Sequence, residues 1–259
     1  MLNPIRIIGE SIITAWQEST LIENQTAAYI TGLTHRVRSP KENNRLEKHP
    51  VLLLVHGRHG NEDVPWIFAR NIPDHWLIVA PRGIEFEPES AEHETGYSWI
   101  EMPPTGWPDI EVFDGAVQAL SDFVQALPEV YGADPERVIV MGFSQGAAVA
   151  LATAIQHPHI FSGIASLVGF VPSIVPSIND TDHHNEDEER VNGQPLKNVP
   201  VWMAAGERDE RIPLEIAIAS RDTVQAAGAD VRWEVYETGH KLNGKGMRDL
   251  TAWLKGMIE

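Results

Sequence analysis

Three side chains in this sequence are of the types that acyl transfer requires: Ser144, Asp209 and His240. In such chemistry a hydroxyl attacks a carbonyl carbon, an imidazole takes the hydroxyl proton, and a carboxylate orients the imidazole. Ser144 is the centre of GFSQG at residues 142–146, a Gly-x-Ser-x-Gly motif. This motif is typical of a sharp turn that presents a serine nucleophile, provided that a strand precedes it and a helix follows.

The residues on both sides of the motif supply that context. Residues 137–141 (RVIVM) are apolar and β-branched, as in a buried strand, and residues 147–156 are rich in helix formers. A glycine two positions either side of Ser144 lets the turn approach neighbouring chain closely. The helix then points its free N–H groups at the serine. The alternative is a serine that only caps an ordinary β-α turn.

The other two side chains follow strands farther along the chain. Asp209 lies four residues after a predicted strand at residues 199–205, and His240 lies four residues after one at residues 231–236. The chain order Ser, Asp, His matches one known arrangement of this triad, with each member just past a strand. The carboxyl ends of parallel strands share one edge of a sheet, so we expect the three side chains to meet there.

Neighbouring residues offer alternatives for two of the roles. Glu207 and Glu210 flank Asp209, while His56 and His59 are further candidate bases. We favour Asp209 because the residues that follow it fit the pattern better, and we expect the base after the last strand. His56 is expected instead to shape the loop that binds the oxyanion.

Two backbone N–H groups are candidates for binding the oxyanion of a tetrahedral intermediate. A fully apolar stretch, VLLLV at residues 51–55, leads into HGRHGNE at residues 56–62. Glycines there allow N–H groups to point into a cleft, so the N–H of Arg58 is predicted as one donor. The N–H of Gln145, at the start of the helix after the serine, is predicted as the other. The alternative interpretation of residues 56–62 is an ordinary β-α loop.

Composition limits the partners and the compartment. The chain has 259 residues, no cysteine and a formal net charge of −17. Such acidity argues against nucleic acid and anionic membrane surfaces as partners. The lack of cysteine excludes disulfides, thiolate metal sites and thiol catalysis. No signal peptide and no run of about eighteen apolar residues is visible, so we expect a cytoplasmic protein without membrane insertion.

Strand and helix patterns alternate across residues 51–259. This alternation predicts an α/β fold: a mostly parallel central sheet with helices on both faces, in a three-layer αβα sandwich. We expect a single domain over residues 1–259, in which residues 1–50 add antiparallel edge strands and a polar connection. The candidate edge strands are residues 5–8, 12–16, 27–33 and 35–38.

Residues 84–108 interrupt the alternation with a long irregular loop. Long loops inside compact domains are often functional, and their aromatic side chains can line a substrate site. The predicted substrate-binding residues are Trp99 and Trp107 in this loop and Phe170 after a later strand, with Tyr97 and Met102 as further candidates. The alternative is that these side chains only pack the loop onto the body of the domain.

Residues 173–198 form an acidic insertion that is a candidate lid. The run from Asp180 to Arg190 holds His183 and His184 among carboxylates, which raises metal binding as an option. A solvated segment is the better interpretation, because dense acidic runs without apolar residues rarely pack. We therefore predict no metal site.

The chain resembles the phospholipase/carboxylesterase family of the α/β-hydrolase superfamily, which includes carboxylesterases and acyl-protein thioesterases. The matching segments lie within residues 51–240 and read VHGRHGN, APRG, GFSQGA, GERD and TGH. The resemblance implies an α/β-hydrolase fold and a serine esterase that hydrolyses short- to medium-chain esters of small molecules without a cofactor. It places one oxyanion donor at Arg58, where members often have an apolar residue or Gly. It also implies that a homodimer is a common assembly.

The chain departs from the family pattern around the predicted site. Ala147 follows Gly146 where members commonly have a second Gly, and Trp99-Ile100 stands where they carry Trp-Phe-Asp. Because that loop would define the substrate, an acyl-thioesterase or lysophospholipase is an alternative to a carboxylesterase. Two further alternatives are a dienelactone-hydrolase-like or depolymerase-like enzyme and a hydrolase-fold protein that only binds a ligand. The serine nucleophile argues against dienelactone-hydrolase-like chemistry, and the complete triad argues against a protein that only binds a ligand.

Overall fold

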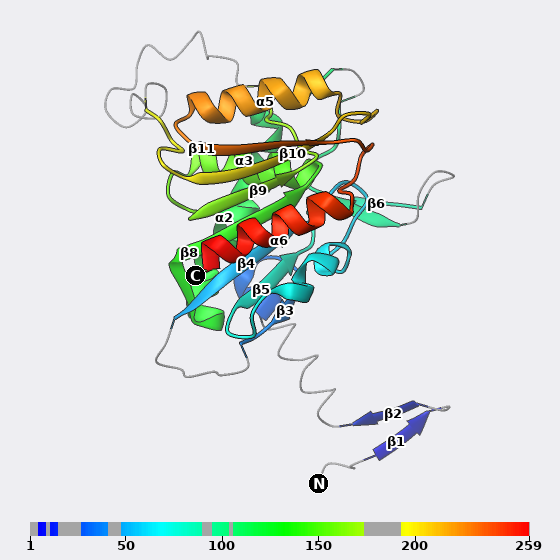
Figure 1. The fold of residues 1–259 in the computed structure, drawn as a ribbon. Helices are drawn as coiled ribbons and strands as arrows, with labels where there is room; N and C mark the ends of the chain where they lie inside the picture. Colours follow the sequence, from blue (N-terminus) through cyan, green and yellow to red (C-terminus); the bar gives the residue numbers. More distant parts are fainter. Residues whose placement is uncertain are drawn as a thin grey trace, which may run out of the picture.

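The computed structural model describes residues 5–8, 11–14, 27–40, 48–89, 95–103, 106–173 and 193–258. Its main sheet contains β3 (His35–Arg38), β4 (His49–Val55), β5 (Leu77–Pro81), β8 (Ala133–Phe143), β9 (Gly163–Leu167), β10 (Pro200–Gly206) and β11 (Asp230–Tyr236). The strand order is β11-β10-β9-β8-β4-β5-β3 (Figure 1). Every neighbouring pair is parallel except β3 with β5. The predicted mostly parallel sheet is confirmed.

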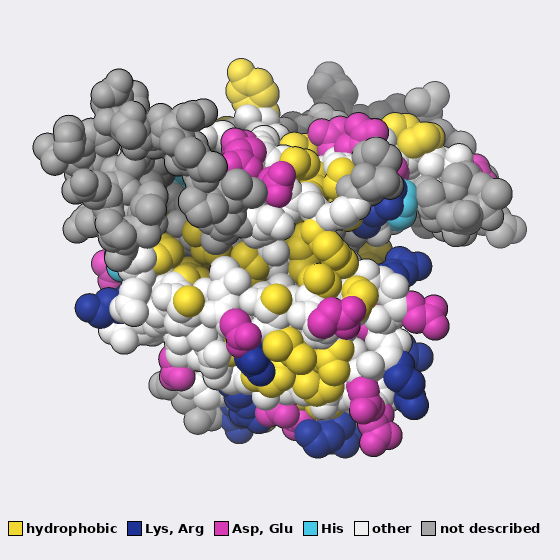
Figure 2. Space-filling view, turned by 90° about the horizontal axis from the view of Figure 1, so that it is seen from above, with side chains coloured by type: hydrophobic (Ala, Val, Ile, Leu, Met, Phe, Trp, Pro, Cys, Tyr) yellow, Lys and Arg dark blue, Asp and Glu magenta, His cyan; other side chains and the backbone are white. Residues whose placement is uncertain are grey.

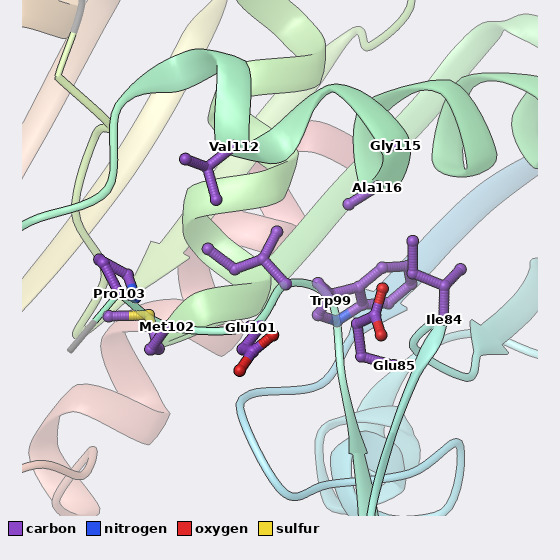
Figure 3. A pocket seen from close by; sticks show the side chains of 10 residues that line it. Ile84, Glu85, Trp99, Glu101, Met102, Pro103, Val112, Gly115 and Ala116 are labelled. Carbon is purple, nitrogen blue, oxygen red and sulfur yellow. The ribbon is translucent and has the colours of Figure 1, made fainter.

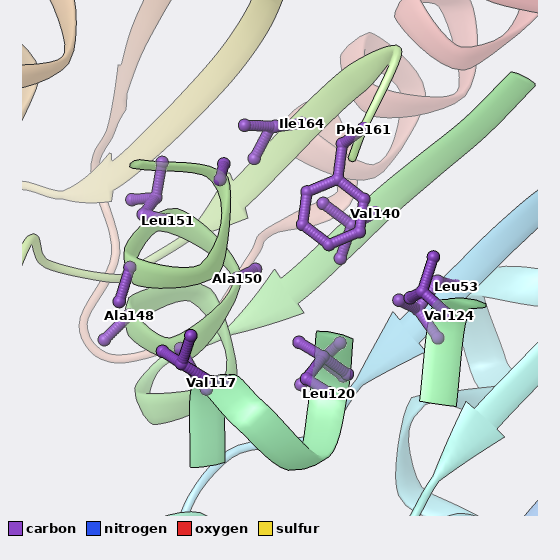
Figure 4. Packing of buried hydrophobic residues seen from close by; sticks show 14 of the residues in the cluster. Leu53, Val117, Leu120, Val124, Val140, Ala148, Ala150, Leu151, Phe161 and Ile164 are labelled. Carbon is purple, nitrogen blue, oxygen red and sulfur yellow. The ribbon is translucent and has the colours of Figure 1, made fainter. Parts of the chain in front are cut away.

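Helices cover both faces of this sheet because both faces of its central strands are apolar. In β4 the side chains of Val51, Leu53 and Val55 belong to one buried cluster, and those of Leu52 and Leu54 belong to another. Successive side chains of a strand point to opposite faces, so one uninterrupted apolar run serves two cores. The first cluster packs against α2 (Asp114–Tyr131), α3 (Gln145–Gln156) and α5 (Leu214–Ala226); part of it is seen in Figure 4. The second packs against η1 (Val64–Asn71) and α6 (Gly244–Ile258), which completes three layers.

Helix α2 continues past a proline and ends at a glycine. A short 3-10 turn, η2 (Ile110–Phe113), precedes it, and Pro128 lies inside its last turn instead of ending it. The helix ends at Gly132, which adopts a left-handed conformation with φ of 67°. A glycine takes this helix-ending conformation without the steric cost that a side chain would add.

The N-terminal predictions are confirmed in part. β3 is the antiparallel edge strand that the sequence predicts, and it pairs with β5. β1 (Ile5–Ile8) and β2 (Ser11–Thr14) pair only with each other, so they do not extend the main sheet. Residues 27–31 are helical and not a strand. Ala27 and Thr31 are both buried, at helical spacing, and the Thr31 hydroxyl donates to the Ala27 carbonyl at 2.9 Å.

The predicted loop at residues 84–108 contains regular structure. β6 (Glu85–Glu87) and β7 (Gly96–Ser98) form an antiparallel hairpin. The Tyr97 N–H donates to the Gly60 carbonyl at 2.7 Å, which ties this hairpin to the loop after β4. The hairpin therefore holds residues 99–103 against the carboxyl edge of the main sheet.

Part of the acidic insertion, residues 174–192 with His183 and His184, lies outside the described residues. Its last part is described: Leu196 is buried, and its N–H donates to the Ala227 carbonyl at 2.9 Å. Within the described ranges, no group of three or more His, Asp or Glu side chains could hold a metal ion. Among all the residues that the structure describes, no helix is long and apolar enough to cross a bilayer.

Candidate active site

Ser144 occupies a strained turn between β8 and α3. Its φ and ψ are 55° and −119°, a region that residues with a side chain rarely adopt. Crowding explains the glycines on either side. A Cβ on Gly146 would collide with the carbonyl oxygens of Val55 and His56, and one on Gly142 would lie 2.5 Å from backbone atoms of Ala147. Strain of this kind persists only where the surrounding structure enforces it.

His240 bridges Ser144 and Asp209. Its Nε2 lies 2.9 Å from the Ser144 Oγ, and its Nδ1 lies 2.8 Å from the Asp209 Oδ2. An ionised carboxylate can only accept, so the Nδ1–H of His240 donates to Asp209. The neutral imidazole then keeps a lone pair on Nε2, which accepts the hydroxyl proton of Ser144. This is the geometry in which a histidine can remove that proton.

The carboxylate of Asp209 is held from its other side. Its Oδ1 accepts hydrogen bonds from the backbone N–H groups of Arg211 at 2.9 Å and Ile212 at 3.0 Å. The Asp209 side chain is only 1% exposed, whereas Glu207 and Glu210 are exposed. Of the three neighbouring carboxylates, the structure therefore brings only Asp209 to the histidine.

The loops that carry Asp209 and His240 are joined by backbone hydrogen bonds. The N–H of Glu207 donates to the Tyr236 carbonyl at 2.8 Å, and the N–H of Arg208 donates to the Thr238 carbonyl at 2.9 Å. These loops follow β10 and β11, which pair in parallel up to Gly206 and Tyr236. The sheet register therefore sets the distance between the carboxylate and the imidazole.

His56 is not placed to act as a base. Its Nδ1–H donates to the Gly57 carbonyl at 2.7 Å, and its Nε2 accepts from the Gly83 N–H at 2.8 Å. Burial lowers the pKa of His56 to about 4, because a charged imidazole would lose its hydration. His56 is therefore a neutral side chain that ties the loop after β4 to the loop after β5, in line with its predicted role in shaping the first of these loops.

Arg58 and Gln145 both lie beside Ser144. Gln145 is the first residue of α3, and the first N–H groups of a helix have no acceptor within it. Gly57 packs against the serine so closely that a Cβ there would lie 3.3 Å from the Ser144 Cβ, which brings the next residue to the cleft. The Gln145 amide side chain accepts from the Trp99 N–H at 2.7 Å and donates to the Ile100 carbonyl at 3.1 Å. Gln145 is thus free to offer only its backbone N–H to a ligand.

A cleft of about 480 Å³ opens over Ser144. Trp107 and Phe170, both predicted to bind substrate, line it with their ring centroids 5.0 Å apart. Two cleft residues outside the predicted substrate site, Arg211 and Ile212, follow shortly after Asp209 in the chain. The full lining comprises Arg58, His59, Met102, Trp107, Ser144, Gln145, Phe170, Arg211 and Ile212.

The prediction that Trp99 binds substrate is wrong for this cleft. Trp99 is 0% exposed, and its Nε1–H donates to the His56 carbonyl at 2.9 Å. It lies beneath a second pocket of about 530 Å³ between the β6 hairpin and α2 (Figure 3). Met102 borders both hollows, but Ser144 does not line the second one. An indole sealed in this way supports neighbouring loops and contacts no ligand in the cleft. Tyr97, unlike Trp99, lines neither hollow.

Several known proteins are similar to this chain. A family model described as Phospholipase/Carboxylesterase matches residues 37–258. The chain is 26% identical over 172 residues to an Arabidopsis thaliana protein named "Probable carboxylesterase SOBER1-like", covering 62% of this chain. It spans only 60% of the length of that relative. It is 29% identical over 166 residues to "Acyl-protein thioesterase 1" of Kluyveromyces lactis, covering 63% of this chain and 67% of the other.

Solved structures show the same fold. The Bacillus cereus carboxylesterase superposes with a TM-score of 0.71 at 19% identity, covering 91% of this chain and 99% of the other. At this level of identity the likeness establishes the fold alone. The predicted α/β-hydrolase fold is confirmed.

Proposed function

The chain belongs to the phospholipase/carboxylesterase family, and from that premise we propose that it is a serine carboxylesterase for short- to medium-chain carboxylic esters. The observation that carries the proposal is the chain of contacts from Asp209 through His240 to Ser144, at 2.8 and 2.9 Å. Ser144, at the end of this chain of contacts, lines a cleft large enough for a small ester. The relatives named carboxylesterase and acyl-protein thioesterase support the same class of reaction.

In the first half of the proposed reaction, the Ser144 Oγ attacks the ester carbonyl carbon while its proton passes to the His240 Nε2. The Asp209 carboxylate stabilises the imidazolium that forms and keeps the ring oriented. The tetrahedral intermediate then collapses, because the bond from the carbonyl carbon to the leaving oxygen breaks. That oxygen takes the proton from Nε2, an alcohol departs, and the acyl group stays on Ser144.

In the second half, a water molecule gives a proton to the His240 Nε2 and attacks the acyl carbon. The bond to the Ser144 Oγ breaks, and the proton returns from His240 to that oxygen. One ester and one water thus become one carboxylic acid and one alcohol, and the enzyme is regenerated. Every proton transferred in the two halves passes through the His240 Nε2.

Negative charge on the carbonyl oxygen develops in both halves. We assign its stabilisation to the backbone N–H groups of Gln145 and Arg58, which lie on two sides of Ser144. Removing one such donor from a well-studied protease costs about 3–4 kcal/mol of transition-state stabilisation. Trp107, Phe170 and Met102 would form the apolar wall for the acyl chain.

The test is hydrolysis of p-nitrophenyl esters of increasing acyl length by the wild-type protein and the Ser144→Ala variant. We expect the variant to lose activity by at least about 10⁴-fold, since removal of a comparable serine in a protease costs about 10⁶-fold. Ser162→Ala is the matched control, because Ser162 donates to the Val138 carbonyl, away from the cleft. Ester hydrolysis that survives in Ser144→Ala would refute the proposal.

Two further readouts complete this test. A fluorophosphonate should label the wild-type protein at Ser144 and leave Ser144→Ala unlabelled, whichever ester is the natural substrate. Matched ester and thioester probes with the same acyl chain would decide between a carboxylesterase and a thioesterase.

The lack of cysteine is compatible with the predicted cytoplasmic location.

A further inference from the structure

The cleft over Ser144 is basic in an otherwise acidic molecule. The chain has 37 Asp and Glu residues against 20 Lys and Arg. Carboxylates are scattered over the face shown in Figure 2. Among the described residues that line the cleft, however, two are arginines, one is His59, and none is Asp or Glu. A lining drawn at random from this composition would contain more carboxylates than arginines, so the reversal points to a function.

The two arginines reach the cleft from opposite sides of the serine. Arg58 comes from the loop after β4, next to the glycine that packs on Ser144. Arg211 comes from the loop after β10, where its own N–H donates to the Asp209 carboxylate at 2.9 Å. In the sheet, β4 is beside β8 on one side, and β10 lies beyond β9 on the other. A ligand whose carbonyl lies at Ser144 would therefore have a guanidinium group on either side.

Neither guanidinium is strongly neutralised by the described residues. The only carboxylate there within 4 Å of Arg58 is that of Glu87, with Oε1 at 3.6 Å from the Arg58 Nε. Glu87 also accepts a shorter bond, 2.8 Å, from the Ser98 hydroxyl, and the Arg58 side chain is 46% exposed. An ion pair so long and so exposed is weak. Within the same described ranges, no carboxylate lies within 4 Å of the Arg211 guanidinium.

We propose that the natural ester carries an anionic group, a carboxylate or a phosphate, which Arg58 and Arg211 bind while the ester carbonyl lies at Ser144. Guanidinium groups suit this task because their planar donors match both anions with paired hydrogen bonds. The overall charge of −17 repels such a substrate at a distance, so binding depends on local cations. This inference rests on the proposed esterase function and names the substrate class.

The experiment compares esters that differ only in charge. 4-Carboxyphenyl butyrate carries a carboxylate in the leaving group, and 4-carbamoylphenyl butyrate is its neutral match. Monomethyl adipate carries a carboxylate in the acyl part, and the methyl ester of adipic monoamide is its neutral match. 4-Butyryloxyphenyl phosphate tests a phosphate in place of the first carboxylate, and its neutral match is again 4-carbamoylphenyl butyrate. The measured quantity is the ratio of kcat/KM for each anionic ester to that of its neutral match.

We expect the wild-type protein to prefer at least one anionic ester by about tenfold, the size typical of a hydrogen bond to a charged group. Arg58→Gln and Arg211→Gln should each lower that ratio several-fold, and added salt should lower it in the wild-type protein. Because the ratio divides out any general loss of activity, it reports recognition of the anion. Arg137→Gln is the matched control. Arg137 is exposed, pairs with Asp134 and lies towards the amino end of β8. The ratio measured with Arg137→Gln should therefore equal the wild-type ratio.

Two results would overturn the inference. One is a wild-type ratio near or below one for every anionic probe, and the other is a high ratio that both arginine variants keep. Neutral esters hydrolysed through Ser144 would leave the proposed function standing in either case. Calorimetric titration of the inert Ser144→Ala protein with the same esters separates the two claims if nothing is hydrolysed. Tighter binding of the anionic member, lost in Ser144→Ala/Arg211→Gln, would support the inference without turnover, and equal binding would refute it.

Discussion

Replacing Asp209 with Asn tests the assigned roles most sharply, because the structure fixes how the new amide must lie. The Oδ1 atom of Asp209 accepts two backbone N–H groups, at 2.9 and 3.0 Å, and Oδ2 faces the His240 Nδ1 at 2.8 Å. An asparagine oxygen can replace only one of these oxygens. If it faces the two N–H groups, the amide NH₂ faces His240. If it faces His240, the N–H groups of Arg211 and Ile212 lose their acceptor, and the buried one, that of Ile212, costs about 1–3 kcal/mol.

The first orientation is therefore favoured, and it is harmful to the chemistry. An NH₂ group can only donate, so it draws the lone pair of His240 to Nδ1 and leaves the proton on Nε2. That nitrogen then points a proton at Ser144 and cannot remove one. The corresponding change in a serine protease lowers kcat by about 10⁴-fold, which equals roughly 5 kcal/mol. We expect a loss of about 10³–10⁴-fold in kcat here, with little change in KM, because Asp209 does not line the cleft.

The assay is steady-state hydrolysis of the best p-nitrophenyl ester by Asp209→Asn, beside Glu210→Gln as the matched control. Glu210 is exposed and one residue away, so its variant should keep wild-type activity. Circular dichroism and a urea melt check that the Asn variant is folded. A folded Asp209→Asn protein within tenfold of wild-type kcat would refute the assigned role of this carboxylate.

Two other predictions concern stability. Burial lowers the pKa of His56 to about 4, so the folded state stays neutral there while the unfolded chain takes up a proton below about pH 6.5. This contribution to stability is complete above pH 6.5 and falls as the pH drops towards 4, so about 2 kcal/mol should be lost between pH 7.5 and 5. Urea melts of His56→Gln should show a correspondingly smaller loss, and an equal loss would contradict this origin. Ser144 has a φ of 55°, so the free energy of unfolding of Ser144→Gly should be about 1 kcal/mol higher than that of Ser144→Ala. The reverse order in urea melts would mean that the turn is unstrained.

The sheet and the relative positions of Ser144, Asp209 and His240 could be predicted because local rules suffice for them. Each of the three follows an apolar strand, and parallel strands bring their carboxyl ends to one edge. Residues 51–55 are apolar throughout, which predicts a strand buried on both faces. Such patterns lie within a few residues of the side chains that they position.

The burial of Trp99 could not be predicted because it depends on distant partners, and the helical turn at residues 27–31 could not be predicted because it goes against the strand preference of its own residues. Trp99 is buried through the side chain of Gln145 and the carbonyl of His56, which lie more than 40 residues away on either side. Residues 27–31 contain Tyr, Ile and Thr, which favour strands, but the hydrogen bond from the Thr31 hydroxyl to the Ala27 carbonyl and the burial of Ala27 accompany a helical turn. The cleft residue Arg211 is invisible to motif analysis because only its position after Asp209 marks it.

The burial of Trp99 explains how four loops keep one geometry around Ser144. Its backbone N–H is bound by the side chain of Gln145, next to the serine, and its indole N–H is bound by the carbonyl of His56. The His56 imidazole in turn accepts from the Gly83 N–H. Every donor in this network has a buried partner, and a fully satisfied buried network resists rearrangement. The N–H groups assigned to the oxyanion are adjacent to these anchors, so they need no reorganisation when the charge forms, which is the condition for strong stabilisation.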